Sequence, residues 1–293
     1  DAGSIKVVLD GVDITGLTGA NAAGFSYIVS PDLADGAHSL EIAVKDLSGN
    51  LAQAVRTFTT DVSAPGVVIA IPAEGSLLAT GTPEVSGTWS DGATAVDPSS
   101  VRVFVDEASV SLSGAVITAA GFHIPLAAAL NDGGHGVRVE VKDTAGNLGQ
   151  ATNSFTTDTT PPVVSSAIPA SGAVLTSNLP VISLNYSDAT SGIDTSGVRI
   201  TMDTVDVTSQ ATVAEASLQY VPVSPLSDGP HLVSVHVADV ADHFVDVNFS
   251  FQVMTDTLPP VISNLVPATG ASLNTATPAL SGSFSDNLSG VNP

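Results

Sequence analysis

The stretch Thr-Thr-Asp61-Val-Ser-Ala-Pro65 occurs three times in this chain with small variations. It returns as Thr-Thr-Asp158-Thr-Thr-Pro-Pro162 and as Met-Thr-Asp256-Thr-Leu-Pro-Pro260, so that its aspartates lie 97 and 98 residues apart. Self-similarity at a fixed period is the signature of a repeat architecture, in which each repeat is one structural unit. The sequence therefore predicts a tandem array.

Other landmarks recur in a constant order between these junctions. They are the turns Pro72–Gly75, Pro169–Gly172 and Pro267–Gly270; the Ser-Asp pairs ending at Asp91, Asp188 and Asp286; the strand-ending residues Asp10, Asp106 and Asp203; the Asp-Gly-x-His segments Asp35–His38, Asp132–His135 and Asp228–His231; and the turns Asp46–Asn50, Asp143–Asn147 and Asp239–His243. So many landmarks at one period leave little room for coincidence.

Within a repeat, apolar and polar residues alternate over short runs, as in Val137–Val141 and Leu232–Val237. This period of two is typical of a strand with one face on a core and the other in water. Clusters of Gly, Pro, Asp, Asn and Ser separate about seven such strands per repeat. The sequence predicts an all-β fold of tandem immunoglobulin-like Greek-key β-sandwiches in a linear array. The run Leu126–Leu130 is too short for an independent helix, so we expect at most one helical turn there.

The repeat phase divides the chain into four predicted parts. Residues 62–158 and 159–256 each contain the full set of landmarks. Residues 1–61 lack the two opening strands of a domain, and residues 257–293 contain only those opening strands.

A half-sandwich leaves an unpaired sheet edge that invites pairing with another chain. Three explanations for the two half-domains stay open. The chain is part of one longer repetitive polypeptide, its ends are an arbitrary cut, or separate chains join head to tail. In the last case residues 257–293 of one chain complete residues 1–61 of the next, and main-chain hydrogen bonds provide affinity. The expected partner is therefore a further copy in a homopolymer, or the continuation of the same chain.

Three of these motifs carry a resemblance to a known family: D-x-x-P-P at the junction, D-G-x-H at a corner, and V-x-V-x-D-x-x-G-N before the last strand. Together they make the whole chain resemble the tandem bacterial Ig-like (BIg-type) domains of large surface adhesins and extracellular structural proteins. The resemblance implies an extracellular or cell-surface location on a bacterium. It also implies stiffening of domain junctions by calcium. The fold by itself does not specify a function.

The charge balance excludes several classes of partner. The chain has 29 acidic and 7 basic residues, a formal charge of −22, and phosphate neutralisation requires Lys and Arg, so we expect no nucleic acid. Hydrophobic residues make up 43% and charged residues 12% of the chain, which is too apolar for disorder. No apolar run approaches the roughly 18 residues of a membrane span. Cysteine is absent, so the chain has no disulfide or thiolate chemistry.

Aspartates recur where the entering linker and two loops of a sandwich meet at one pole. The candidate calcium ligands are Asp61, Asp91, Asp97 and Asp143 in one set, Asp158, Asp188, Asp194, Asp239 and Asp242 in the next, and Asp256 with Asp286 in the last. Converging carboxylates suit calcium, which takes roughly six to eight oxygen ligands in flexible geometry. An aspartate in such a loop can equally cap its own turn through the backbone, so both interpretations stay open.

The recurring histidines His38, His135 and His231 lie a full repeat apart and cannot converge on one metal ion. We interpret each as a corner residue whose ring bonds the loop backbone, analogous to the tyrosine corner of immunoglobulin domains. The sequence contains neither a Gly-x-Ser-x-Gly elbow nor a Walker-type phosphate loop. Carboxylate pairs for glycoside hydrolysis would give three identical active sites in one chain, which argues against an enzyme. We expect no catalytic residues and no cofactor other than calcium.

Trp89 recurs as Tyr186 and Phe284 within one short motif, which indicates a core position rather than a sugar-binding platform. The sequence predicts a non-enzymatic extracellular structural protein, a rod or filament of repeated domains. Short proline-rich linkers would limit its bending, and its negative charge would prevent lateral clumping. Two alternatives stay open: the shaft of a large bacterial surface adhesin, and an accessory binding module of a secreted hydrolase.

Overall fold

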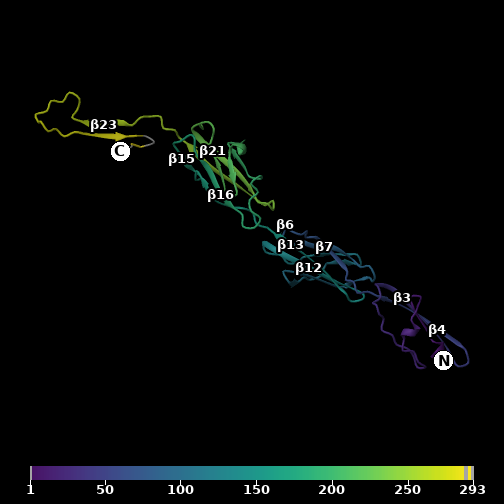
Figure 1. Ribbon diagram of the computed structural model, residues 1–293. Coiled ribbons are helices and arrows are strands. Elements are labelled where there is room, and N and C mark those ends of the chain that lie inside the picture. The colour runs from purple at the N-terminus through teal and green to yellow at the C-terminus, as the bar shows by residue number, and fades with distance from the viewer. Residues whose placement is uncertain (1, 287–289, 292–293) are drawn as a thin grey trace. The chain divides into compact units, whose positions relative to one another are not determined.

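Strands make up most of the computed structural model, which describes residues 2–286 and 290–291 (Figure 1). The chain separates into two units, Asp1–Asp158 and Thr159–Pro293. The prediction of an all-β chain of tandem immunoglobulin-like sandwiches is confirmed. The division into four parts at residues 61, 158 and 256 stays a prediction.

The first unit begins with a single four-stranded sheet, ordered β2–β1–β3–β4. Its elements are β1 (Lys6–Leu9), β2 (Val12–Asp13), β3 (Gly36–Lys45) and β4 (Leu51–Thr60), with the short 3-10 helices η1 (Ala2–Ser4) and η2 (Thr15–Leu17). Val7, Leu9 and Ile14 form its small buried cluster. Among the described residues, no strand pairs with the outer edge of β4.

Residues 66–157 form a two-sheet sandwich with sheet orders β10–β11–β7–β5 and β6–β13–β12–β8–β9. Its strands are β5 (Gly66–Ile71), β6 (Ser76–Leu78), β7 (Glu84–Ser90), β8 (Val96–Val105), β9 (Ala108–Ser109), β10 (Val116–Thr118), β11 (Gly121–Pro125), β12 (Gly133–Asp143) and β13 (Leu148–Thr157). The short β6 pairs with β13 in parallel, and the other pairs are antiparallel. Leu126–Leu130 contains no helical turn.

The second unit repeats this topology over residues 163–253, with sheet orders β14–β16–β20–β19 and β15–β22–β21–β17–β18. Its elements are β14 (Val163–Ile168), β15 (Ala173–Leu175), β16 (Ile182–Ser187), β17 (Arg199–Met202), β18 (Val205–Asp206), η3 (Thr208–Gln210), β19 (Thr212–Ala214), β20 (Ser217–Tyr220), β21 (Gly229–Ala238) and β22 (Phe244–Val253). β15 pairs with β22 in parallel, as β6 does with β13. The last strands, β23 (Val261–Val266) and β24 (Ser281–Ser285), form a two-stranded hairpin.

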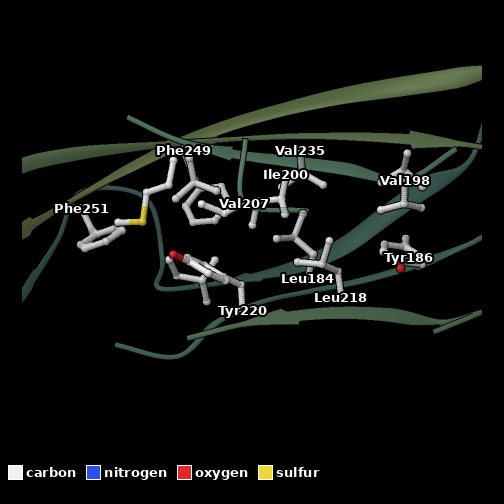
Figure 2. Close-up of a cluster of buried hydrophobic side chains, with 14 of the residues drawn as sticks. Leu184, Tyr186, Val198, Ile200, Val207, Leu218, Tyr220, Val235, Phe249 and Phe251 are labelled. Carbon is white, nitrogen blue, oxygen red and sulfur yellow. The ribbon is translucent and has the colours of Figure 1, made fainter. Parts of the chain in front are cut away.

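The core of each sandwich lies between its two sheets, where the apolar positions of the alternating strands face inward. Val137, Val139 and Val141 on β12 are at most 1% exposed, and the charged residues between them lie on the outer face. In the second sandwich, Tyr186 from one sheet and Ile200 and Phe251 from the other point into the same interior (Figure 2). Burial of each such side chain contributes about 1.5–3 kcal/mol to folding.

The recurring aromatic position has two different environments. Trp89 is 4% exposed and stacks on Phe122, and Tyr186 is 2% exposed, so both are core residues as predicted. Phe284, at the same position of the last repeat, is 64% exposed. Among the described residues, no second sheet covers the hairpin β23–β24. The expectation of a buried side chain is therefore wrong for Phe284 in this structure.

Candidate functional sites: loop carboxylates and histidine corners

Three carboxylates of the first unit converge at one pole of its sandwich. Oxygen atoms of Asp61, Asp91 and Asp143 lie within 4.8 Å of one another. Asp61 follows β4, Asp91 follows β7 and Asp143 ends β12, so the linker and two loops meet as strand parity requires. Negative charges at this spacing repel one another, which favours a cation or hydrogen-bond donors between them.

Asp143 holds its own loop closed. Its Oδ1 accepts the N–H of Gly146 at 2.6 Å and of Asn147 at 2.9 Å, and its Oδ2 accepts Asn147 Nδ2 at 2.8 Å. Asp143 is only 3% exposed. Burial alone would raise the pKa of this carboxyl, but the hydrogen bonds from Asn147 and Gly146 hold it below its ordinary value. Turn capping is therefore one role of Asp143.

Thr94 joins the other two carboxylates. Its Oγ1 donates to Asp61 Oδ2 at 2.5 Å, and its N–H donates to Asp91 Oδ1 at 2.9 Å. Asn147 Nδ2 also donates to the carbonyl oxygen of Asp61 at 3.1 Å. A network of neutral donors thus surrounds the three carboxylates and fixes the loops that carry them.

Two of the predicted ligands, Asp97 and Asp194, cap turns of their own. Asp97 is outside the group of three. Its Oδ1 accepts hydrogen bonds from the N–H of Ser99 at 2.9 Å and from the hydroxyl of Ser99 at 2.6 Å. Asp194 makes the same contacts with Ser196, at 2.9 and 2.6 Å. The sequence could not separate these two aspartates from Asp91, because all of them lie in the same kind of polar loop.

In the second unit, the loop equivalent to Asp143–Asn147 has a different chemistry. Asp239 is 1% exposed, and its Oδ1 accepts the N–H of His243 at 2.9 Å. The ring Nδ1 of His243 lies 3.6 Å from Asp239 Oδ2. An imidazole therefore takes the place of the Asn147 amide.

Most of the remaining predicted ligands lie in turns of their own. Asp188 Oδ1 accepts three successive backbone N–H groups of residues 190–192 at 2.9–3.0 Å. Asp158 is fully buried at the end of the first unit. Asp242 adopts a φ of 68° in its turn. Asp256 and Asp286 accept a backbone N–H from Leu258 and Gly290, respectively, at 3.0 Å.

Each histidine of the Asp-Gly-x-His motif bridges two segments in the same way. The distance from ring Nδ1 to a carboxylate oxygen is 2.6 Å for His38 and Asp10, 2.7 Å for His135 and Asp106, and 2.6 Å for His231 and Asp203. The ring Nε2 faces the carbonyl oxygen four residues earlier at 2.8–2.9 Å. The other carboxylate oxygen accepts the N–H of the residue after the histidine. The corner interpretation is confirmed, and its aspartate partner is an addition from the structure.

The surroundings of the corner histidines favour the protonated ring. Both ring nitrogens of His231 face acceptors, a carboxylate and a carbonyl, so both must hold protons to donate. Burial alone would lower the pKa of His231, but the hydrogen bonds to Asp203 and to the Ser227 carbonyl raise it above its ordinary value of 6.5. The pKa of His135 is raised for the same reasons against the same burial. The geometry of each corner therefore suits an imidazolium–carboxylate pair.

Comparisons with known proteins found one family model and several solved structures that resemble parts of this chain. The CopC domain family matches residues 164–254, within the second unit, and no curated protein matches the chain. Fibronectin(III)-like modules of Clostridium thermocellum CbhA are 17% identical, with 64% of this chain and 93% of that chain covered and a TM-score of 0.34.

Two further solved structures match most of this chain. A three-domain immunoglobulin fragment of titin is 10% identical over 86% of this chain and 88% of that one, with a TM-score of 0.47. A solved structure concerned with host cell surface retention of a 1.5-MDa bacterial ice-binding adhesin is 16% identical, with 86% of this chain and 86% of the solved chain covered and a TM-score of 0.36. Similarity at these levels concerns the fold and not the function. No helix among the described residues is long and apolar enough to cross a membrane.

Proposed function

We propose that this chain is a non-enzymatic structural segment of an extracellular or cell-surface bacterial protein, a rod or filament of BIg-type domains. The observation that carries the proposal is the repetition of one two-sheet sandwich. In both complete sandwiches, the core positions and the histidine corner recur at the same phase. The polar residues that recur hold loops closed, as Asp143 does.

The placement of the first and last strands supports a mechanical role. β6 lies near the start of its sandwich and pairs in parallel with the last strand β13, and β15 pairs with β22 in the same way. A pull on the two ends of a sandwich therefore shears a parallel pair along its length. Several main-chain hydrogen bonds then have to break together, which resists extension more than opening them one by one.

Single-molecule stretching of the full chain tests this role. We expect two discrete unfolding events, each lengthening the chain by about 300 Å, since a repeat of this size extends to ~3.4 Å per residue. Leu77→Pro removes a donor from β6 and should lower the force of one event only, with the second sandwich as internal control. Extension without discrete events would contradict the proposal.

The two alternatives predict different partners. An accessory module of a hydrolase would bind an insoluble polysaccharide in a pull-down assay, whereas a structural rod would stay in solution. The mass of the native polypeptide under fully denaturing conditions separates an adhesin shaft from a subunit. A species many times larger than 29.2 kDa would favour a shaft within one long chain.

We also propose that calcium stiffens the junction at Asp61, Asp91 and Asp143. The support is their mutual oxygen spacing within 4.8 Å, because oxygen ligands of this charge suit calcium. Donation from Thr94 and Asn147 offsets only part of the repulsion among three carboxylates. A bound cation would join the linker at Asp61 to two loops of the following sandwich.

Thermal unfolding with calcium or EDTA tests this site. Calcium at a hundred times its Kd should stabilise the first sandwich by about 2.7 kcal/mol. Asp91→Asn removes one charge of the group and should abolish most of that gain. Asp97→Asn removes the same charge from a residue outside the group and serves as the matched control. An unchanged melting temperature on adding EDTA to the calcium-loaded chain would contradict the proposal.

A further inference from the structure

Every lysine and arginine of this chain lies in the equivalent sheet of its repeat. These residues are Lys6, Lys45, Arg56, Arg102, Arg138, Lys142 and Arg199. Their strands belong to the sheets β2–β1–β3–β4, β6–β13–β12–β8–β9 and β15–β22–β21–β17–β18. Among the described strands, those of the other sheets carry neither lysine nor arginine. A chain with 29 acidic residues thus gathers its few cations in one sheet of each repeat.

Two of these cations face one hollow on the first sandwich. Arg102 on β8 and Lys142 on β12 are exposed, and the residues on either side of each are buried, so both side chains point outward. Together with Ser100, Glu140 and Leu148 they line a hollow of about 290 Å³. Its volume lies at the lower end of the roughly 300–1,000 Å³ of small-molecule pockets, which suits one small polar unit.

The carboxylate in this lining is already neutralised. Glu140 pairs with the guanidinium of Arg138, its neighbour on the same face of β12. Arg138 also donates to Glu107 Oε2 at 2.9 Å, so two carboxylates share its charge. Glu140 is therefore held by Arg138, and the charges of the two cations of the hollow stay available for another anion.

Those two cations have no counter-ion of their own. Among the described residues, neither Arg102 nor Lys142 forms an ion pair. Asp97 lies opposite Lys142 in the ladder, but its Oδ1 accepts both donors of Ser99. Ser100 Oγ accepts the N–H of Lys142 at 2.8 Å and fixes the backbone that carries the ammonium group. Two positive charges beside one hollow favour the binding of an anion there.

The neighbouring side chains on β13 indicate the kind of anion. Leu148 lies opposite Lys142, and Gln150 lies opposite Glu140. Leu148 is 49% exposed, so it offers an apolar contact to the C–H groups of a sugar ring. Gln150 is also exposed, and its amide can both donate to and accept from hydroxyl groups. A small inorganic anion would use only the two cations, whereas a sugar with a carboxylate would use the leucine and the amide as well.

The same face of the second sandwich lacks this combination. Arg199 has the repeat position of Arg102, but its Nη1 donates to two carbonyl oxygens of its own segment at 2.5 and 2.8 Å. Ala238 has the repeat position of Lys142. Asp246 lines the second hollow, which lies on this face, and its carboxylate would repel an anion. The pair of available cations is therefore particular to the first sandwich.

We propose that the hollow between Arg102 and Lys142 binds a uronic acid unit, a sugar with a carboxylate group, of a soluble acidic polysaccharide. The Arg102 guanidinium pairs with both carboxylate oxygens, the Lys142 ammonium adds a second charge, and the ring lies on Leu148. Binding at this one site is weak, because the chain as a whole has a formal charge of −22 and repels anions at long range.

This binding goes beyond the proposed structural function, since it gives the rod a means of attaching to acidic polysaccharide around it. The ligand is a soluble acidic chain, so the activity differs from the retention on insoluble polysaccharide expected of a hydrolase module.

A nuclear magnetic resonance titration of the full chain with trigalacturonate, at about 0.15 M salt, tests the proposal. We expect saturable shifts of the backbone amides of Arg102, Lys142 and Leu148. Arg102→Gln and Lys142→Gln should each raise the Kd about tenfold. Arg199→Gln removes the same charge at the same repeat position of the second sandwich, and this matched control should leave the Kd unchanged.

Two further ligands separate the sugar from its charge. Galactotriose, a neutral trisaccharide, should cause no shifts at the hollow. Inorganic sulfate should bind more weakly than trigalacturonate, and Leu148→Ala should weaken only trigalacturonate. Sulfate binding as tightly as trigalacturonate, a Kd that Arg102→Gln leaves unchanged, or no shifts at any concentration would overturn the proposal.

The acidic loops of a second copy are the competing source of a carboxylate. Shifts at the hollow that appear on raising the protein concentration alone, and that Arg102→Gln removes, would assign the hollow to a second copy and overturn the saccharide. Stretching of a single chain does not depend on either ligand, so none of these results would affect the proposed structural function.

Discussion

The open region at residues 2–60 and the sandwich at residues 66–157 share one sequence pattern but differ in their interior. Phe155 is 2% exposed and Phe58 is 39% exposed at the same repeat position. The histidine corner is the same in both regions. The distance from the ring Nδ1 to the carboxylate oxygen of its aspartate partner is 2.7 Å for His135 and 2.6 Å for His38. The corner uses only strands that both regions possess, whereas the core needs the opening hairpin.

This difference separates two sources of stability in the repeat. Hydrogen bonds of the corner form within one sheet and its adjoining loop, so they persist without the second sheet. Apolar burial requires two faces, and each face contributes only when the other covers it. Perturbations of the corner and of the core should therefore respond differently in the two regions.

The largest expected difference concerns the shared phenylalanine. Phe155→Ala should destabilise the first sandwich by about 3–5 kcal/mol, because it leaves a cavity in a closed core. Phe58→Ala should leave that transition unchanged. Trp89 is the single tryptophan of the chain and lies in this core, so denaturation followed by its fluorescence reports on the first sandwich. Equal shifts for both variants would show that the open region and the sandwich unfold together.

A smaller difference is expected for the loop asparagines. Asn147→Ala breaks contacts with buried Asp143 and with the Asp61 carbonyl, and should lower the melting temperature of the Trp89 transition by about 5 °C. Asn50→Ala breaks the equivalent contact with Asp46 in an exposed loop and should leave the melting temperature of the Trp89 transition unchanged. A comparable fall for Asn50→Ala would mean that the two loops are energetically equivalent.

The smallest effect is a dependence on pH at the corner. The pKa of His135 is raised above 6.5 in the folded chain. The contribution of the charged ring to the free energy of unfolding is therefore fully present below pH 6.5 and is lost as the pH rises through the raised pKa. Asp106 has a pKa below its ordinary 3.8, because its hydrogen bonds outweigh burial, so the pair also weakens in strong acid.

The stability difference between wild type and His135→Gln measures this contribution. Followed by Trp89 fluorescence, it should stay constant below pH 6.5 and shrink as the pH rises above that value. His38→Gln, in the open region, is the control and should not move the Trp89 transition. A difference that stays constant above pH 6.5 as well would show that the His135 ring is neutral and the corner is not an ion pair.

Much of the architecture follows from sequence patterns that act over short distances. Alternation in Val137–Val141 and the turn residues between strands determine strands and loops locally, so the fold class and the repeat were predictable. The meeting of Asp61, Asp91 and Asp143 also followed, because strand parity brings these loops to one pole. The exclusion of Asp97 did not follow, since its contact with Ser99 depends on the conformation of one turn.

The sequence by itself determined the repeat, the strands and the recurring landmarks of this protein. Only the tertiary structure decided that Asp106 pairs with His135, 29 residues away on another strand, and that Phe284 is exposed while Trp89 is buried. The physical reason is that both properties belong to pairs of surfaces and not to single segments. A side chain is buried, and a hydrogen bond is formed, only when a distant part of the chain supplies the matching face.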